Sequence, residues 1–400
     1  MIIVHKYGGS SVATTEKIIR IAEYLGNVRD QGNDVVVVVS AMGKTTDALI
    51  KLANEITDKP DSREMDRLMS TGEQQTIALL SIALQSLGHK AISLTGRQAG
   101  IMTEGHHTKN RIGNINGEII KKYLNEGNIV VVAGFQGINE RGDVATLGRG
   151  GSDTSAVALA AVLEAKCEIY TDVDGIYSID PRIYPEAKKI SVISYDEMME
   201  LAFLGAGVME PRAVELGSKY GVEIYVGKSL GEKNGTLITS KEKVMEKELI
   251  TGISINENTL MVNIEQIPTY ARNVYAIFKE AEKHGINIDM ISQNDVSSEE
   301  GSFAFTCPKT DKSALEKIDA TLKEQFPEIS FIINPYVSKV SVVGVGLVSN
   351  IGIAARVFKV LAENNISFHQ VSTSEISISM IIDEVMAKDV ARLLAKEFEI

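Results

Sequence analysis

A lysine and two glycines end the first apolar run of the chain, and residues of these types can bind an anion. Lys6, Gly8 and Gly9 follow the apolar residues 1–4, and apolar residues at helical spacing over 18–25 predict that a helix comes next. Glycines let the backbone approach phosphate oxygens, and the free N–H groups at a helix start point toward them. Lys6 adds a positive charge at the same strand end. The segment predicts a phosphate cradle, although an ordinary strand-to-helix turn with a solvated lysine has the same pattern.

The segment Leu147-Gly-Arg-Gly-Gly-Ser-Asp-Thr154 is the most specific polar motif of the sequence. Three glycines surround Arg149, and the Ser-Asp-Thr that follows them opens a predicted helix. A helix cap alone does not need these glycines, whereas the planar guanidinium of an arginine suits a carboxylate. Asp153 could orient Lys6 or help to hold magnesium. The motif therefore predicts a second anion site.

Two other polar segments precede predicted helices. The first, Ser40-Ala-Met-Gly-Lys-Thr-Thr-Asp47, follows the apolar run Val35–Val39 and is either a helix cap or a substrate contact. It is not a Walker A motif, because Val38 stands where that motif needs a glycine. The second, Ser70-Thr-Gly-Glu73, has the spacing of a capping box. Glu73 therefore either closes the start of a helix or holds a substrate ammonium group.

A loop after another predicted strand combines a hydroxyl, acids, an aromatic ring and a basic residue. It runs from Thr171 to Tyr177 and continues into Asp180-Pro-Arg182. This composition suits the base, ribose and phosphates of a nucleotide, and it is equally that of a generic turn. His5, His106 and His107 lack the spacing of metal ligands and need no functional explanation.

Composition excludes several classes of protein. The formal net charge of −12 over 400 residues, with a pI of about 5.2, argues against a general nucleic-acid binder. Cys167 and Cys307 lie far apart in strand-like sequence, which predicts buried free thiols in a reducing compartment. The first residues already have the pattern of a core strand, and no apolar run reaches the ~20 residues of a membrane span. We expect a cytoplasmic protein without nucleic-acid or membrane partners.

Strand-like and helix-like segments alternate from residue 1 to about residue 240. The expected elements are strands over 35–39, 129–133 and 168–171 and helices over 74–87 and 154–165. Continuous valine and isoleucine runs mixed with helices indicate an α/β fold with a mostly parallel sheet covered on both faces. Ligands bind such sheets at the carboxyl ends of the strands.

An internal repeat follows the charge-dense segment Lys241–Glu248, which reads as a helix-like linker. Apolar residues of the first copy, such as Ile286 and Ile291, recur with one constant offset at Ile366 and Val371. Each copy has the pattern strand, helix, strand, strand, which suits two small βαββ modules packed on each other.

Taken together, these motifs resemble those of the aspartokinases, in the same order along the chain. The resemblance rests on Lys6–Ser10, Ser40–Gly43 with Thr46 and Asp47, Gly72 and Glu73, Leu147–Asp153, and Tyr170–Gly175. It implies an amino-acid-kinase-like domain over 1–240, a mostly parallel sheet sandwiched by helices. A linker over 241–250 and two C-terminal α+β ACT modules over 251–335 and 336–400 would follow.

The resemblance implies ATP-dependent phosphorylation of the β-carboxylate of L-aspartate to 4-phospho-L-aspartate, with Mg²⁺. This is the first step toward lysine, threonine and methionine. By motif position Lys6 and Asp153 are catalytic, and no protein residue is assigned as a metal ligand. The residues implied for aspartate are Thr46, Glu73, Arg149 and Ser152, with Glu73 facing the ammonium group and Arg149 the α-carboxylate. The residues implied for ATP are Lys6, Tyr7, Gly8, Gly9, Ser10, Thr171, Asp172, Tyr177 and Arg182.

The repeated tail suits an allosteric sensor. Polar residues after the helix of its first copy could clamp an amino acid or be merely solvated; they are Asn287, Ile288, Asp289, Gln293 and Asn294. By resemblance the effector is lysine or threonine, bound between ACT modules and often across a subunit interface. The resemblance therefore also implies a homodimer or a higher homo-oligomer.

Two departures from the family pattern leave alternatives open. The string Gly205-Ala-Gly-Val-Met209 has Gly207 where the family usually has a lysine that contacts nucleotide, and Lys228 is the candidate replacement. Gln266–Arg272 stands where Pro-Gly is common, which leaves the effector less certain. The rival functions are another carboxylate kinase of the same fold, acting on glutamate, acetylglutamate or carbamate, and a non-catalytic amino-acid sensor.

Overall fold

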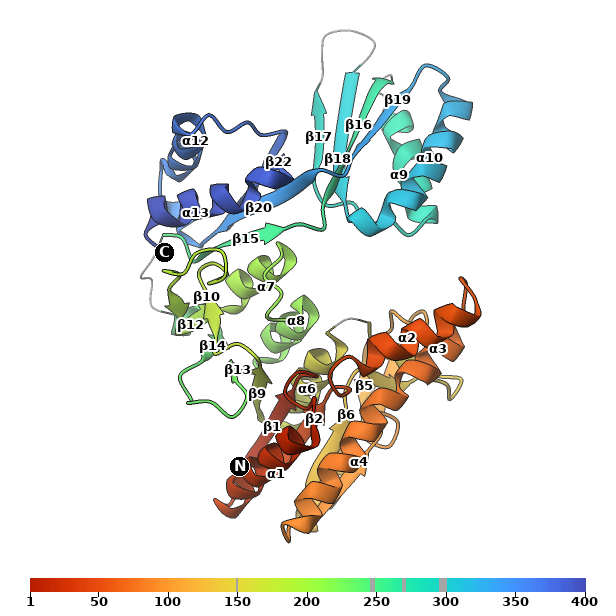
Figure 1. Cartoon of the computed structure of the whole chain (residues 1–400), viewed down its shortest axis with the longest axis vertical. Coiled ribbons are helices and arrows are strands. Elements are labelled where there is room, and N and C mark those ends of the chain that lie inside the picture. The colour runs from red at the N-terminus through yellow and green to blue at the C-terminus, as the bar shows by residue number, and fades with distance from the viewer. Residues whose placement is uncertain (149, 245–248, 268–270, 295–300) are drawn as a thin grey trace. The chain divides into compact units, whose positions relative to one another are not determined.

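The computed structural model contains two units, each with its own core (Figure 1). It describes residues 1–148, 150–244, 249–267, 271–294 and 301–400. The first unit comprises 1–177, 189–202 and 207–246, and the second comprises 178–188, 203–206 and 247–400. The two short segments within the predicted domain 1–240 join the second unit because Ile179 is buried in its core, and because Leu204 accepts a hydrogen bond from Ser254.

The second unit is built from two four-stranded sheets, each with helices packed on one face. The first sheet has the order β17-β18-β16-β19 and the second the order β15-β20-β22-β21. The strands are β15 (Gly252–Asn256), β16 (Leu260–Ile267), β17 (Ile291–Asn294), β18 (Gly301–Cys307), β19 (Ser330–Asn334), β20 (Val337–Val343), β21 (Gln370–Thr373) and β22 (Ser377–Asp383). The helices are α9 (Ala271–Lys283), α10 (Lys312–Gln325), α11 (Gly346–Ser349), α12 (Ile353–Glu363) and α13 (Ala387–Phe398).

The repeat differs from the predicted βαββ pattern in two respects. Each copy has a further helix after its third strand, α10 in the first and α13 in the second. The sheet of the second copy also takes its fourth strand, β15, from before the first copy, with Ile253 opposite Val342. The expected boundary between 335 and 336 therefore does not separate the two sheets. Pairing with β15 satisfies backbone groups that an open β20 edge would leave exposed.

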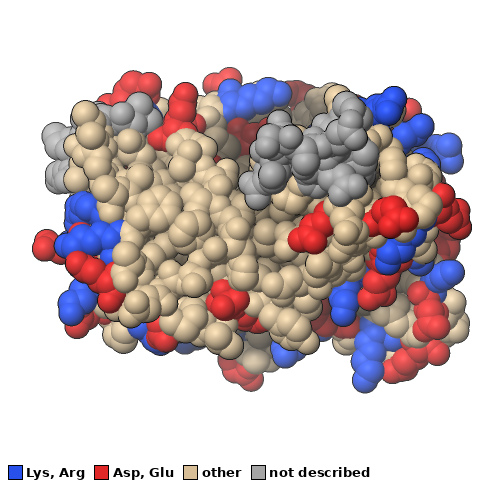
Figure 2. Space-filling view, turned by 90° about the horizontal axis from the view of Figure 1, so that it is seen from above, with Lys and Arg blue, Asp and Glu red and all other residues tan. Residues whose placement is uncertain are grey.

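Side-chain charge is mixed on the face that Figure 2 shows. Figure 2 shows basic and acidic residues interspersed along the margin of one face, with a broad uncharged area between them. Nucleic-acid binding needs lysine and arginine side chains clustered on one face. On the face in Figure 2 the described basic residues are interspersed with acidic ones instead. Cys167 and Cys307 are buried free thiols, as predicted. Among the described residues, no helix combines the length and the apolar character needed to cross a bilayer.

The first unit contains an eight-stranded sheet with the order β12-β14-β13-β9-β1-β2-β6-β3. Its strands are β1 (Ile2–Tyr7), β2 (Asp34–Val39), β3 (Ala91–Leu94), β6 (Ile129–Ala133), β9 (Lys166–Thr171), β12 (Val192–Ser194), β13 (Ile224–Lys228) and β14 (Thr236–Thr239). All neighbours are parallel except β13 and β14. The predicted parallel α/β sheet is thus confirmed.

Short strands and helices complete this unit. A smaller sheet joins β5 (Arg111–Ile115), β4 (Ile101–Glu104), β7 (Gln136–Ile138) and β8 (Val144–Thr146), and β10 (Ile176–Tyr177) pairs with β11 (Lys189–Ile190). The helices are α1 (Thr15–Asp30), α2 (Thr45–Ile56), α3 (Ser62–Met69), α4 (Thr71–Ser86), α5 (Glu118–Asn125), α6 (Gly151–Leu163), α7 (Tyr195–Phe203) and α8 (Pro211–Tyr220). The predicted linker holds a 3-10 turn over Lys241–Lys243, and 245–248 lie outside the described residues.

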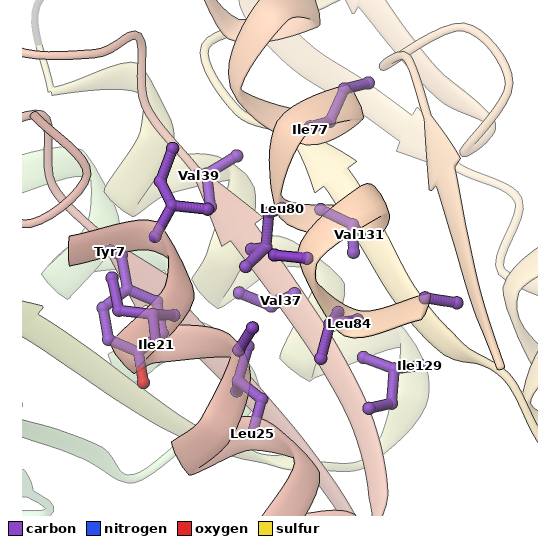
Figure 3. Packing of buried hydrophobic residues seen from close by; sticks show 14 of the residues in the cluster. Tyr7, Ile21, Leu25, Val37, Val39, Ile77, Leu80, Leu84, Ile129 and Val131 are labelled. Atoms are coloured by element: carbon purple, nitrogen blue, oxygen red, sulfur yellow. The ribbon is translucent and has the colours of Figure 1, made fainter. Parts of the chain in front are cut away.

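Helices on one face of the large sheet fix its central strands. Ile21 and Leu25 of α1 and Leu80 of α4 pack against Val37 and Val39 of β2 (Figure 3). All five side chains are fully buried. Burial of such a side chain stabilises the fold by roughly 1.5–3 kcal/mol. The packing holds the strands in register, so the turns that follow them start from fixed positions.

Candidate functional site

The carboxyl ends of neighbouring parallel strands bring several polar turns together. Tyr7 of β1 lies in register with Val39 of β2 and with Tyr170 of β9. Backbone hydrogen bonds continue past the strand ends, from Gly8 N to Tyr170 O at 3.2 Å and from Ser40 N to Tyr7 O at 3.1 Å. Such an edge of a parallel sheet is where ligands bind. The turns after β1, β2 and β9 therefore form one site.

The predicted phosphate cradle follows β1 as a turn that only glycine fits. Gly9 O accepts a hydrogen bond from Gly43 N at 3.0 Å, which brings the turn after β2 against it. A Cβ atom at Gly9 would lie 2.9 Å from Ala41 O, closer than real side chains come. Tyr7 is fully buried beneath the turn, and Ser10 is exposed at its end. The small residue lets the backbone approach a ligand closely.

Lys6 and Asp153 form a buried ion pair beside this turn. Lys6 Nζ lies 2.6 Å from Asp153 Oδ1, and both side chains are only 11% exposed. Asp153 stands in the first turn of α6, which packs on β1 and begins after Gly150 with its φ of +65°. The pair therefore holds an ammonium group at the N-terminus of a helix, where partial positive charge already gathers. A negatively charged ligand is the natural occupant of such a place.

Ser152 lies next to the turn after β2. Its Oγ accepts a hydrogen bond from Ser40 Oγ at 2.9 Å. A Cβ atom at Gly134, which follows β6, would lie 2.7 Å from Ser152 Oγ, so that position also requires glycine. Thr46 is half-buried in the first turn of α2. Ser152 thus stands at the strand edge of the site, and Thr46 on the helix that follows the turn after β2.

Glu73 reaches across to the same turn and does not cap its helix. Its Oε1 accepts a hydrogen bond from Ala41 N at 3.1 Å, whereas the Ser70 hydroxyl donates to Arg67 O. The capping-box interpretation is therefore wrong. Glu73 is 3% exposed, and no described residue donates a hydrogen bond to its buried Oε2. Burial raises the pKa of Glu73 to about 7. An unpaired buried carboxylate of this kind suits a cationic group.

The predicted nucleotide residues fall in two places. Thr171 ends β9, its hydroxyl donates to Asp172 at 3.0 Å, and the Asp172 side chain is exposed. The Tyr177 hydroxyl donates to Asp174 Oδ1 at 3.0 Å, while burial and this contact raise the pKa of Tyr177. Arg182 belongs to the second unit, where its guanidinium pairs with Asp180 at 2.7 Å. Arg149 lies outside the described residues.

The predicted effector residues lie in the second unit. Asn287, Asp289 and Gln293 are exposed, Ile288 packs against the core of its module, and Asn294 ends β17. Asp289 forms an ion pair with Lys339 of the other sheet, whose side chain is 3% exposed. Sequence reasoning missed this partner, because Lys339 lies 50 positions from Asp289, in the other copy of the repeat.

Other contacts near the strand edge also escaped prediction. Lys189 Nζ lies 2.9 Å from Asp174 Oδ2, which steadies the loop that carries Tyr177. His107, for which no role was expected, lies 2.6 Å from the fully buried Asp66. Both pairs join separate segments, so no local spacing could have signalled them.

Known proteins are similar to this chain in sequence and in fold. The family model described as the amino acid kinase family matches residues 1–228, and the ACT domain model matches residues 340–398. An aspartokinase of Geobacillus stearothermophilus is 48% identical over 384 residues, which is 96% of this chain and 93% of that protein. An aspartokinase of Bacillus sp. strain MGA3 is 46% identical over 404 residues, which is 100% and 97% of the two chains. The crystal structure of Escherichia coli aspartokinase III in complex with aspartate and ADP has the same fold, with a TM-score of 0.85 over 100% of both chains at 23% identity.

The raised pKa of Glu73 predicts a pH-dependent gain in stability for Glu73→Gln. In the unfolded chain this carboxyl titrates near 4.5. Below pH 4.5 it is neutral in both states, and the free energy of unfolding has its full value. This stability is lost as the pH rises through about 7, because the unfolded chain ionises more easily than the folded protein. Glutamine stays neutral and keeps an oxygen for Ala41 N. We expect the variant to exceed the wild type by ~3 kcal/mol near pH 8 and to match it near pH 4.

Urea unfolding at the two pH values measures this difference. Glu118→Gln is the control, because Glu118 is a glutamate with an 80% exposed side chain, at the start of α5. It should leave the free energy of unfolding unchanged at both pH values. An equal effect of Glu73→Gln at both pH values would contradict the assignment.

Proposed function

The chain belongs to the aspartokinase family and is an aspartate kinase, and we propose that it moves the γ-phosphoryl group of ATP onto the β-carboxylate of L-aspartate with the residues described above. The observation that carries this proposal is the Lys6–Asp153 pair, which holds an ammonium group at the glycine turn after β1. A carboxylate and a triphosphate repel each other, so their reaction needs fixed positive charge where they meet.

The chemistry needs positioning and charge neutralisation more than proton transfer. The β-carboxylate of aspartate has a pKa near ~4 and is already a nucleophilic anion at neutral pH. No general base is required. In our proposal Lys6 neutralises charge on the transferred phosphoryl group, and Asp153 keeps Lys6 in place. The N–H group of Gly9 adds a further donor, and the start of α6 adds the partial positive charge of a helix N-terminus; the N–H group of Gly8 already donates to Tyr170 O.

Four residues are proposed to hold aspartate. Glu73 Oε2 takes the ammonium group, which gives a partner to an oxygen that lacks one among the described residues. A bound cation would also stabilise the ionised form and bring the pKa of Glu73 down. Arg149 takes the α-carboxylate, on the strength of its motif. Ser152, next to the turn after β2, and Thr46, in the first turn of α2, supply hydroxyl groups.

The nucleotide is proposed to lie along the ends of β1 and β9. Gly8, Gly9 and Ser10 would surround its phosphates, with the buried Tyr7 beneath the turn, and Thr171, Asp172 and Tyr177 would contact the rest by motif position. Arg182, which belongs to the second unit, stays a prediction from its motif. Among the residues that the structure describes, none lies within 4 Å of a Cβ atom placed at Gly207, so none of their side chains fills the place of the usual lysine. Lys228 lies in register with Thr171 at the end of β13 and is exposed, which supports it as the substitute cation.

Magnesium fits this site as a companion of the phosphates. The described residues contain no group of three or more His, Cys, Asp or Glu side chains placed to hold a metal ion. Mg²⁺ commonly binds through substrate phosphates, waters and one or two carboxylates. Asp153 is the carboxylate closest to Lys6 and is our candidate. When bound, the ion would neutralise charge on the triphosphate.

The second unit is proposed to sense lysine or threonine. Asn287, Ile288, Asp289, Gln293 and Asn294 would bind the effector, and Asp289 already pairs with an ammonium group, that of Lys339. Exposed large apolar side chains on this unit, such as Tyr336 at 76%, support assembly into a homodimer or a higher oligomer. Buried free thiols support a cytoplasmic location.

Hydroxylamine trapping tests the reaction itself. With ATP, Mg²⁺ and L-aspartate, we expect the acyl phosphate to be captured as a hydroxamate, because this product reacts readily with nucleophiles. L-Glutamate, acetylglutamate and carbamate serve as matched acceptors. Product with one of these and none with aspartate would favour the rival kinase. No product with any acceptor would favour the non-catalytic sensor.

Lys6→Ala should lower kcat by roughly 10²–10³, the loss typical of one preorganised electrostatic group. Lys166→Ala is the control, because Lys166 is an exposed lysine at the opposite end of β9. It should retain wild-type kcat. Thermal unfolding is recorded for both variants, since Lys6→Ala leaves Asp153 buried without its partner. Near-normal turnover in folded Lys6→Ala would overturn the role of Lys6.

Calorimetry tests the sensor. We expect binding heat from lysine or threonine, and Asp289→Asn should weaken that binding about tenfold because a charged contact is lost. Asp319→Asn is the control, since Asp319 pairs only locally with Lys323 on α10 of the same module. Absence of heat from both amino acids would remove the sensor proposal.

A further inference from the structure

Asp66 is a buried carboxylate that the proposed reaction does not use. It stands on α3 and is 0% exposed. Its Oδ1 accepts hydrogen bonds from Thr108 N at 2.9 Å and from the Thr146 hydroxyl, and its Oδ2 lies 2.6 Å from His107 Nδ1. A buried carboxylate is tolerated only when it is well paired. These partners therefore bind Asp66 tightly, and Asp66 fixes them in return.

The partners of Asp66 border the start of the glycine-rich segment. Thr146 is the last residue of β8 and directly precedes Leu147 and Gly148. Thr108 has a φ of +70°, a backbone conformation that non-glycine residues adopt at a cost. The space that a Cβ atom of Gly148 would occupy lies 3.4 Å from Thr108 O. Asp66 thus holds both the strand that leads into the segment and the backbone that packs beside it.

The same helix leads to the other half of the aspartate site. α3 ends at Met69, and α4, which carries Glu73, begins two residues later. Gln136 Nε2 donates to Ser70 O at 3.0 Å, which ties the junction of the two helices to β7. One buried group therefore links the segment before Glu73 with the segment before Ser152.

We propose that Asp66, together with His107 and Thr146, is a positioning residue for aspartate: it sets the separation between Glu73 and the described residues 147, 148 and 150–152 of the glycine-rich segment. This inference rests on the proposed function, because it assumes that both segments contact one aspartate molecule. Displacement of one segment by about 1 Å can lower reactivity by 10²-fold. Loss of Asp66 should therefore act on aspartate and spare ATP, whose proposed residues follow β1 and β9.

An ion pair between α3 and the residue before β8 provides a control. Arg63 of α3 contacts Asp143 Oδ1 through Nε at 2.9 Å and Nη2 at 2.6 Å. Asp143 directly precedes β8, whereas Thr146 ends it at the glycine-rich segment. The Arg63–Asp143 pair attaches α3 to the residue before β8, whereas the hydrogen bond between Asp66 and Thr146 attaches α3 to the end of β8, next to the segment proposed to bind aspartate.

Steady-state kinetics of Asp66→Asn, Thr146→Val and Asp143→Asn test the inference. We expect Asp66→Asn to raise KM for aspartate on the order of 10- to 100-fold and to leave KM for ATP within about twofold. Thr146→Val, which removes one donor at nearly constant shape, should raise the aspartate KM by a smaller factor. Asp143→Asn should leave both constants unchanged.

Wild-type aspartate KM in folded Asp66→Asn would overturn the inference, as would an equal rise for Asp143→Asn or a parallel rise for both substrates. If Asp66→Asn does not fold, Thr146→Val decides by the same criteria. Hydroxamate formation by the wild type is measured in parallel. Its absence would remove the proposed function, whereas an active wild type with an unaffected Asp66→Asn variant would remove only the positioning role.

Discussion

The site depends on a positive charge kept largely away from water at the end of a central strand. An ammonium group in such a place is stable only with a close anion, and Asp153 provides one at 2.6 Å. The pair also attaches the start of α6 to β1, so the helix N-terminus and the lysine face the same turn. The ammonium group of Lys6 is therefore in place once the protein has folded, and it needs little reorganisation during the reaction. In our proposal, an acidic chain in this way presents an ordered ammonium group to two anions.

Glu73 is a residue of the same site that lowers the stability of the fold. A carboxyl group with one unpaired buried oxygen destabilises the fold once it ionises, and a neutral side chain of the same shape would avoid that cost. In our proposal the carboxylate is kept because the ammonium group of the substrate pairs with its free oxygen. Groups that are unsatisfied without substrate and satisfied with it give both affinity and discrimination against ligands that lack the cation.

Sequence reasoning succeeded where the chemistry lies within one segment. The valine-rich run of β2 and the β6 strand were predicted from local pattern. The glycine motifs also singled out Lys6 and Asp153, which form an ion pair, while their catalytic roles stay a prediction. It failed where contacts join distant segments. Spacing favoured Ser70 as the partner of Glu73, but the partner is Ala41 N, on another turn. The pairing of Asp66 with His107 spans 41 positions and leaves no periodic trace.

The pairing of β15 with β20 in the second unit has a consequence for how the chain folds. β15 and β20 pair across about 90 residues, with the whole first module between them. Closing so long a loop is entropically unfavourable and raises the contact order of this sheet. During synthesis β15 leaves the ribosome before the intervening module and must stay unpaired until β20 emerges. Once the first module has folded, less flexible chain separates β15 from β20. The sheet β15-β20-β22-β21 depends on this shortening and therefore forms last.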